Sequence, residues 1–188
     1  MLALSNNGCC PLDPLVQQGA DTLAAVDLMT TSDPAQFDTN GHLYPSSGPA
    51  RGFGRGLRET AQLIRADVDL RVAAVDFGGW DFHDAMGPVS DGTMRAKAQG
   101  LSDALTAFHD DLGPLMDEVT VAVMSEFGRT IGVNGSGGTD HGRGGAMMIM
   151  SGHAVGGVHG DYPSGRHGTT QEVFPGYTHP GDLGVLAV

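Results

Sequence analysis

The sequence predicts one α/β domain with a doubly wound, mostly parallel sheet and flanking helices. Short apolar segments of strand length occur at residues 71–76, 119–124 and 146–150, and a long helical pattern separates the first two. A strand, helix, strand order indicates parallel strands joined by right-handed crossovers. Polar residues of metal-binding type follow the first two segments directly. Parallel sheets carry their functional sites at this position, beyond the carboxyl ends of their strands.

The sequence predicts three helices, over residues 14–29, 57–67 and 93–112. The third has the clearest pattern, because its apolar residues recur at alternating steps of four and three and Gly113-Pro114 ends it. Residues 30–56 have the Ser, Pro, Asn, Asp and Gly content of a loop. The first helix is expected to pack through one apolar side. The residues on that side are Leu15, Leu23, Val26 and Leu28.

The composition limits the classes of partner. A length of 188 residues with 40% hydrophobic content fits one soluble domain, and a formal charge of -12 argues against nucleic acids and anionic membranes. No run reaches the roughly 18 apolar residues of a membrane span, and the first eight residues lack the pattern of a signal peptide. Cys9 and Cys10 are adjacent, which fits neither a disulfide between them nor a zinc motif.

Candidate metal ligands lie in two places. Asp81 and His83 are two residues apart, so an extended segment directs both side chains to one side, where a carboxylate oxygen and an imidazole nitrogen can reach one ion. Glu126 ends the second apolar segment, and Asp140-His141 lies between glycines that permit close backbone approach. In a parallel sheet these residues are expected to converge at one edge.

Other polar residues near these motifs allow more than one interpretation. Arg129 and Asn134 are assigned to substrate binding, since a guanidinium group suits a phosphate or sulfate. A structural pair between Arg129 and Glu126 or Asp140 is the alternative. Asp76 is either a further ligand or an acceptor for His83. Trp80 is expected to anchor the Asp81 loop by packing.

Three motifs together resemble a known family. GGWDFH at 78–83, MSEFGRT at 124–130 and GGTDHGRGG at 137–145 resemble, in the same order, the signatures of the bacterial family called domain of unknown function 1501. That family is a branch of the alkaline phosphatase and sulfatase superfamily, and the resemblance covers about residues 50–161. It implies the doubly wound fold, a metal site at the strand ends and export to the periplasm.

The sequence departs from the family pattern in several respects. An upstream strand with a Gly-Gly-x-Asp-Gly motif, and the Ser, Thr or Cys nucleophile expected after it, have no counterpart here, and the family pattern continues past Val188. Residues 1–188 are therefore interpreted as one truncated domain, the carboxyl-terminal part of such a protein. Phe82 replaces the usual Thr of the first motif. Phe127 follows Glu126 where alkaline phosphatases carry Asp-His, so one ligand is missing.

Two functional hypotheses follow. In the first, the chain is part of a metal-dependent hydrolase of small phosphate or sulfate esters, using zinc, or alternatively manganese or calcium, with no catalytic nucleophile assigned. The metal ligands would be Asp81, His83, Glu126, Asp140 and His141. In the second, the chain is a non-catalytic metal- or anion-binding module of the same fold, and Phe127 is the best support for that alternative.

Overall fold

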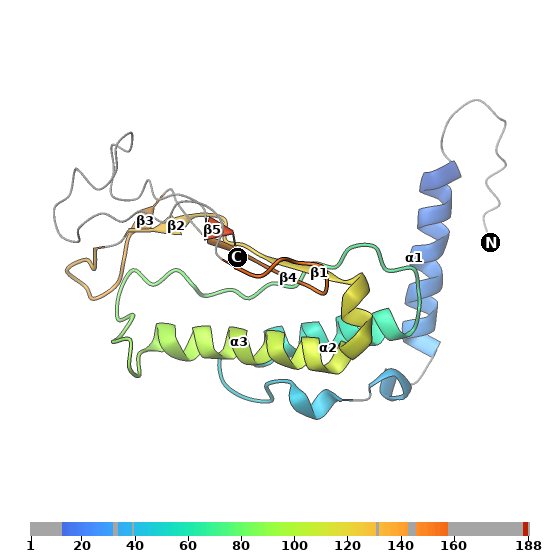
Figure 1. The fold of residues 1–188 in the computed structure, drawn as a ribbon, viewed down its shortest axis with the longest axis horizontal. Helices are drawn as coiled ribbons and strands as arrows, with labels where there is room; N and C mark the ends of the chain where they lie inside the picture. Colours follow the sequence, from blue (N-terminus) through green and yellow to red (C-terminus); the bar gives the residue numbers. More distant parts are fainter. Residues whose placement is uncertain are drawn as a thin grey trace.

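The computed structural model describes residues 13–31, 34–38, 40–130, 132–142, 146–157 and 186–187. Two long helices, α2 (Arg51–Arg65) and α3 (Thr93–Leu112), pack side by side beneath a small sheet (Figure 1). Three short 3-10 helices accompany them: η1 (Pro34–Phe37), η2 (Gly41–Leu43) and η3 (Gly113–Glu118). The described residues thus form a mixed helix and sheet structure.

The core lies between α2 and α3. On α2, Phe53, Leu57 and Ala61 recur at steps of four and are buried, and Phe108 of α3 is buried against them. Gly100 permits the close helix crossing, because a Cβ there would lie 2.6 Å from the Cβ of Ala50. The helix predicted at 93–112 is confirmed at both ends. The core residues are Tyr44, Phe53, Leu57, Ala61, Ala104, Ala107, Phe108, Leu112 and Met116.

Helix α2 starts earlier than the sequence predicts, at Arg51 instead of residue 57. Three glycines in its first two turns lower its intrinsic helix propensity. Two contacts within the fold offset this loss: burial of Phe53, and the packing of Gly54 against Pro45, whose ring lies 2.9 Å from the position of an added Cβ. The local composition therefore misplaces the start of the helix, because tertiary packing decides it.

The predicted doubly wound parallel sheet is not present among the described residues. Strand β1 (Thr120–Val123) pairs antiparallel with β4 (Ala146–Ser151), and β2 (Gly128–Arg129) pairs antiparallel with β3 (His141–Gly142). The short β5 (Leu186–Ala187) adds the one parallel pair, against β4. The physical reason is the connection: the described residues between β1 and β4 include no crossover helix, and the chain returns as one long hairpin that contains β2 and β3.

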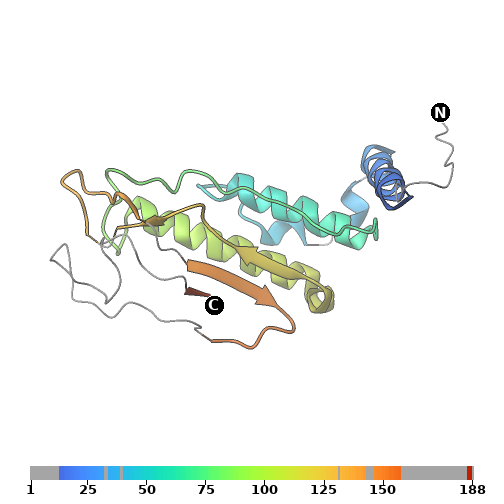
Figure 2. The same cartoon turned by 90° about the horizontal axis from the view of Figure 1, so that it is seen from above.

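The strand predicted at 71–76 is also wrong, because this segment is extended but joins no ladder. Figure 2 shows it running above α2 on the side of β1 away from β4. Only one side of the segment is held: Val75 and Phe77 pack on the core, and the Phe77 ring stacks on Phe53 with centroids 4.9 Å apart. Val72 is 84% exposed. Aromatic packing on the helix thus replaces strand pairing.

Helix α1 (Asp13–Thr31) is confirmed as a helix, but its expected packing is wrong. Leu23 is 71% exposed and Val26 is exposed as well, while the side chains of Leu15 and Leu28 lie outside the described residues. The helix stands at one end of the molecule (Figure 1). The apolar sides of α2 and α3 cover each other, which leaves no core surface for α1. Among the described helices, none combines the length and apolarity of a membrane span.

A buried ionic group ties the helices to the loop that precedes them. Asp111 of α3 has a side chain that is 1% exposed, and it accepts hydrogen bonds from the Arg65 guanidinium and, at 2.7 Å, from the Tyr44 hydroxyl. Burial opposes ionisation of Asp111, but the hydrogen bonds from Arg65 and Tyr44 outweigh it and lower the pKa of this carboxyl. Burial also raises the pKa of Tyr44, so the phenol stays protonated.

Candidate metal centre

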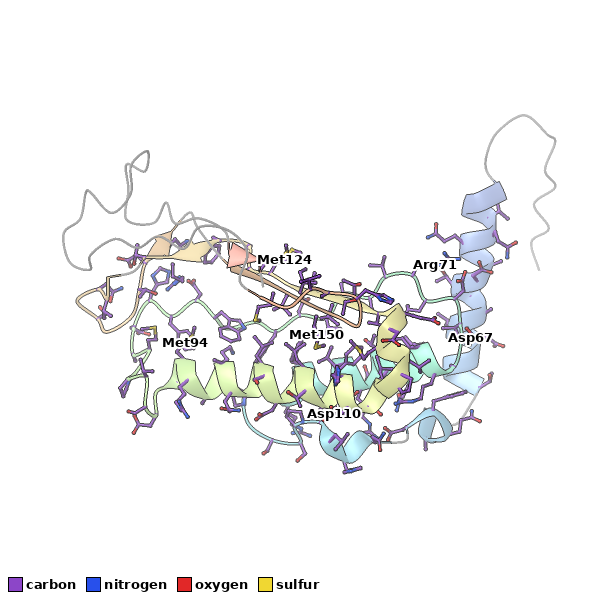
Figure 3. All side chains as sticks on the ribbon, in the orientation of Figure 1. Asp67, Arg71, Met94, Asp110, Met124 and Met150 are labelled. Atoms are coloured by element: carbon purple, nitrogen blue, oxygen red, sulfur yellow. The ribbon has the colours of Figure 1, made fainter. Side chains whose placement is uncertain are left out.

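The candidate site lies where the hairpin leaves β1 and returns toward β4. Asp81 and His83 belong to the loop that follows the extended segment above α2, and His141 begins β3. In Figure 1 this end carries β2 and β3, and α1 stands at the other end. Met150 on β4 faces α3 beneath the sheet (Figure 3), so the core lies below the hairpin and the site is at its far end.

Backbone hydrogen bonds join the two loops that supply the site. The Thr139 amide donates to the Phe82 carbonyl at 2.9 Å, and the Ala85 amide donates to the Ser136 carbonyl at 3.1 Å. Gly138 lies where the loops are closest, because a Cβ there would overlap the backbone of residues 82–84. This glycine is required for close approach of two backbones.

Three side chains meet at the junction. The Oδ1 of Asp81 lies 3.1 Å from Nε2 of His83 and 3.0 Å from Nε2 of His141, and the two Nε2 atoms lie 3.1 Å apart. Ligands about 2.0–2.1 Å from one zinc ion at tetrahedral or octahedral angles are roughly 2.9–3.4 Å apart. The three donor atoms therefore fit one face of a single metal coordination shell.

Neighbouring groups orient each member of this triad. Arg129 donates to Asp81 Oδ1 and is itself held by Thr139, through both the hydroxyl and the carbonyl of that residue. Asp140 Oδ1 lies 3.4 Å from Nδ1 of His83, the nitrogen that faces away from the junction. A carboxylate behind a histidine in this way fixes the ring tautomer and directs the other nitrogen toward a metal.

The third ligand candidate is oriented by an aromatic contact. The Phe127 ring stacks on His141 with centroids 4.1 Å apart and an interplanar angle of 23°. The rings of His83 and His141 lie 4.8 Å apart. Phe127, which the sequence suggested only as a missing ligand, therefore restricts rotation of the His141 ring.

The local charge suits a cation. At Asp81, desolvation opposes ionisation, but hydrogen bonds from His141 and Arg129 are stronger and lower the pKa. At Asp140, the hydrogen bond from Asn134 is the main cause of a lowered pKa, followed by that from His83. Both carboxylates are thus ionised at neutral pH. Arg129 pairs with Asp81, and Asp140 adds a second negative charge behind His83.

The structure brings together some predicted ligands and separates others. Within the described part of the chain, the only group of three or more such ligands that could share an ion is Asp81, His83 and His141. Asp140 lies behind His83, and Glu126 is exposed in the bend before β2. Phe127, the residue after Glu126, stacks on His141, and Glu126 is not part of the triad.

The two residues assigned to substrate make their hydrogen bonds to protein groups. Arg129 pairs with Asp81, not with Glu126 or Asp140. Asn134 donates to the His83 carbonyl and to Asp140, and its substrate role stays a prediction. Asp76 is exposed, and Trp80 packs edge-on against Phe77 at 5.2 Å beside the Asp81 loop. The sequence indicated close backbone approach at the glycines beside Asp140-His141, but it did not indicate that the close contact of Gly138 is with the 82–84 backbone or that Thr139 holds Arg129.

The ligand candidates converge for a different physical reason from the one that the sequence predicts. From the sequence, every ligand was expected beyond a parallel strand. In the structure, Asp81 and His83 follow an unpaired extended segment, and His141 lies on the returning arm of an antiparallel hairpin. The residues meet because the two loops hydrogen-bond to each other, so the convergence arises without a parallel sheet.

The chain matches the family model described as protein of unknown function (DUF1501) over residues 46–175, more than half of its length. The chain therefore belongs to this family. The match includes all three motifs that carried the resemblance, and it includes the triad. No curated protein and no solved structure matches the chain.

Gly138→Ala is expected to destabilise the protein by about 1–3 kcal/mol, because the new methyl group would separate the two loops. Gly135→Ala is the matched control in the same hairpin, since a Cβ there meets nothing within 4 Å. Urea unfolding of both variants checks the expectation. Equal stabilities would show that the close contact at Gly138 is not maintained in solution.

Proposed function

We propose that Asp81, His83 and His141 hold one divalent metal ion and that the chain is part of a metal-dependent hydrolase of phosphate or sulfate esters. The observation that supports this most is the triangle of donor atoms with sides of 3.0–3.1 Å. In this proposal the complete domain has the doubly wound fold of the alkaline phosphatase superfamily, of which the described helices and hairpin form a portion.

The donor set favours zinc. One carboxylate and two imidazoles are a common catalytic zinc set, in which three protein ligands leave a position for water or substrate. Calcium is disfavoured because it prefers oxygen ligands alone. Manganese and iron(II) also accept this set, so both serve as competitors in metal measurements. A bound ion would polarise the ester oxygen and lower the pKa of a coordinated water.

The residues of the chain itself would hold and orient that centre. Arg129 keeps Asp81 ionised and in place, and Asp140 directs Nε2 of His83 toward the ion. The triad side chains are 49–52% exposed, so a small ester in solution can reach the open side. Among the described residues, no Ser, Thr or Cys side chain hydrogen-bonds to the triad, which supports a nucleophile supplied from outside them or from water.

A non-catalytic metal-binding module is the second candidate. Its support is the small number of ligands: Glu126 lies outside the triad, and Phe127 stacks on His141 where the superfamily resemblance implies a further ligand. A two-metal centre of the alkaline phosphatase type would need more donors than the described residues bring together. The two candidates share the metal site and differ only in whether the bound ion catalyses ester hydrolysis.

Hydrolysis of aryl phosphates and aryl sulfates separates the two candidates. The assay compares this chain with a protein that contains it together with the upstream strand and nucleophile implied by the resemblance, each with and without chelator. We expect chelator-sensitive turnover in the longer protein, its loss in His83→Ala, and little turnover by this chain alone. Zinc binding without turnover in the longer protein would favour the non-catalytic module.

A further inference from the structure

Asn134 occupies an unusual position in the hairpin beside the candidate metal centre. Its side chain is partly buried, and its amide group makes four hydrogen bonds. The Oδ1 atom accepts from the Ser136 amide at 3.0 Å and from the Gly138 amide at 3.1 Å. The Nδ2 group donates to the His83 carbonyl at 2.9 Å and to Asp140 Oδ1 at 3.1 Å. All usual donors and acceptors of the amide are therefore in use.

The two halves of the amide connect different parts of the site. Its oxygen holds the turn of its own hairpin, which delivers Gly138 to the contact between the loops. Its nitrogen reaches the other loop at the backbone of His83, and it also reaches the carboxylate that stands behind the His83 ring. Asn134 thus fixes both the backbone and the ring partner of one ligand candidate from the hairpin that carries His141.

We propose that Asn134 is a positioning residue that sets the location of His83 relative to His141. The inference rests on the proposed metal centre for its functional meaning, but the position itself can be tested without metal. It replaces the expectation that Asn134 binds substrate. A substrate could use the amide only by displacing one of four protein hydrogen bonds.

Asparagine is the residue type that this position requires. Aspartate has the same size and keeps the two acceptor bonds to Ser136 and Gly138, so the hairpin turn is retained. It loses both donor bonds and places a second carboxylate beside Asp140 and the His83 carbonyl. Asn134→Asp therefore breaks the link to the ligand loop while it preserves the local turn.

The negative charge that Asn134→Asp adds and the loss of positioning are expected to change metal affinity in opposite directions, so the measured sign distinguishes them. An added negative charge close to a cation site should by itself strengthen metal binding. Loss of positioning should weaken it, and loss of partners that orient metal ligands lowers affinity by about 10–100-fold. Gln17→Glu is the matched control, since it makes the same amide-to-acid change on the exposed helix α1 at the other end of the molecule (Figure 1).

The experiment measures zinc affinity by calorimetry and amide hydrogen exchange at Thr139, whose amide donates across the loops to Phe82. For Asn134→Asp we expect zinc affinity lower by about 10–100-fold and faster Thr139 exchange. Gln17→Glu should change neither. Asn134→Ala, which removes the two donor bonds and the two acceptor bonds without adding charge, should also weaken zinc binding. Melting of each metal-free variant checks that it folds.

The outcomes separate the two proposals. Unchanged Thr139 exchange in both Asn134 variants, or wild-type or tighter zinc binding by them, would overturn the positioning role. If the wild-type protein binds no zinc while exchange at Thr139 rises in both variants, the metal centre is wrong and Asn134 still positions the His83 loop. If neither variant folds, amide hydrogen exchange is measured in the wild-type protein alone. A Thr139 amide no better protected than the exposed amides of the hairpin would overturn the positioning role of Asn134.

Discussion

Asp111→Ala is expected to lower the free energy of unfolding by about 3–5 kcal/mol, the largest single effect that the structure predicts. Removal of one partner from a buried ion pair leaves the other charge uncompensated. Here the Arg65 guanidinium would lose its carboxylate, and the Tyr44 hydroxyl would lose its acceptor. Urea unfolding at neutral pH measures the effect.

The neighbouring residue supplies the control. Asp110 is 57% exposed and pairs with His109 on the surface of α3, so Asp110→Ala should change stability by no more than about 0.5 kcal/mol. Similar losses in the two variants would show that Asp111 is not buried in an ion pair in solution.

The buried Asp111 carboxylate also predicts that the free energy of unfolding depends on pH. The pKa of Asp111 in the folded protein is lowered from an ordinary value of 3.8. A lowered pKa contributes stability that is complete above the unfolded pKa and is lost as pH falls through the folded pKa. Wild-type protein should therefore lose more stability than Asp111→Asn as pH falls below about 4. Equal losses of stability in wild-type protein and Asp111→Asn over this range would contradict a lowered pKa for Asp111.

Under the proposed metal centre, whose ligands come together only in the folded state, zinc should stabilise the protein by about 3 kcal/mol at a hundredfold excess over its dissociation constant. For a chain of this size that corresponds to a rise of roughly 5–12 °C in Tm. The rise should vanish in His141→Ala, which removes one donor of the triad. His109→Ala, on the exposed face of α3, is the matched control.

A zinc-induced rise in Tm that persists in His141→Ala would show that zinc binds outside the triad. Absence of a shift in well-folded wild-type protein would show that the cluster at Asp81, His83 and His141 is structural. Manganese and iron(II) titrations under the same conditions rank the metals and test whether zinc is preferred.

Local pattern was sufficient for some parts of the fold. Helix 93–112 was predictable because its apolar spacing and the Gly113-Pro114 stop depend only on neighbouring residues. The pairing of β1 with β4 was not, since strand direction depends on how the connection folds, and the glycine-rich loop contained no visible sign of the β2–β3 ladder. Segment 71–76 was ambiguous because a short apolar run can pack on a helix as readily as in a sheet.

The site was partly predictable for a similar reason. Asp81, His83 and His141 have the residue types of metal ligands, and their motifs carry the family resemblance. Glu126 has a suitable type as well, but it lies outside the triad, and residue type and spacing alone do not reveal this. The protein hydrogen bonds of Asn134 and Arg129 could not be predicted, because their partners lie up to 51 residues away in the sequence.

X-ray absorption at the zinc edge tests the central claim most directly. In zinc-loaded wild-type protein we expect one ion per chain with two imidazole ligands, oxygen in the remaining positions and no sulfur. His83→Ala and His141→Ala should each lose one imidazole contribution or fail to retain zinc. A zinc environment without imidazole, or one unchanged in both variants, would contradict the triad as the metal centre.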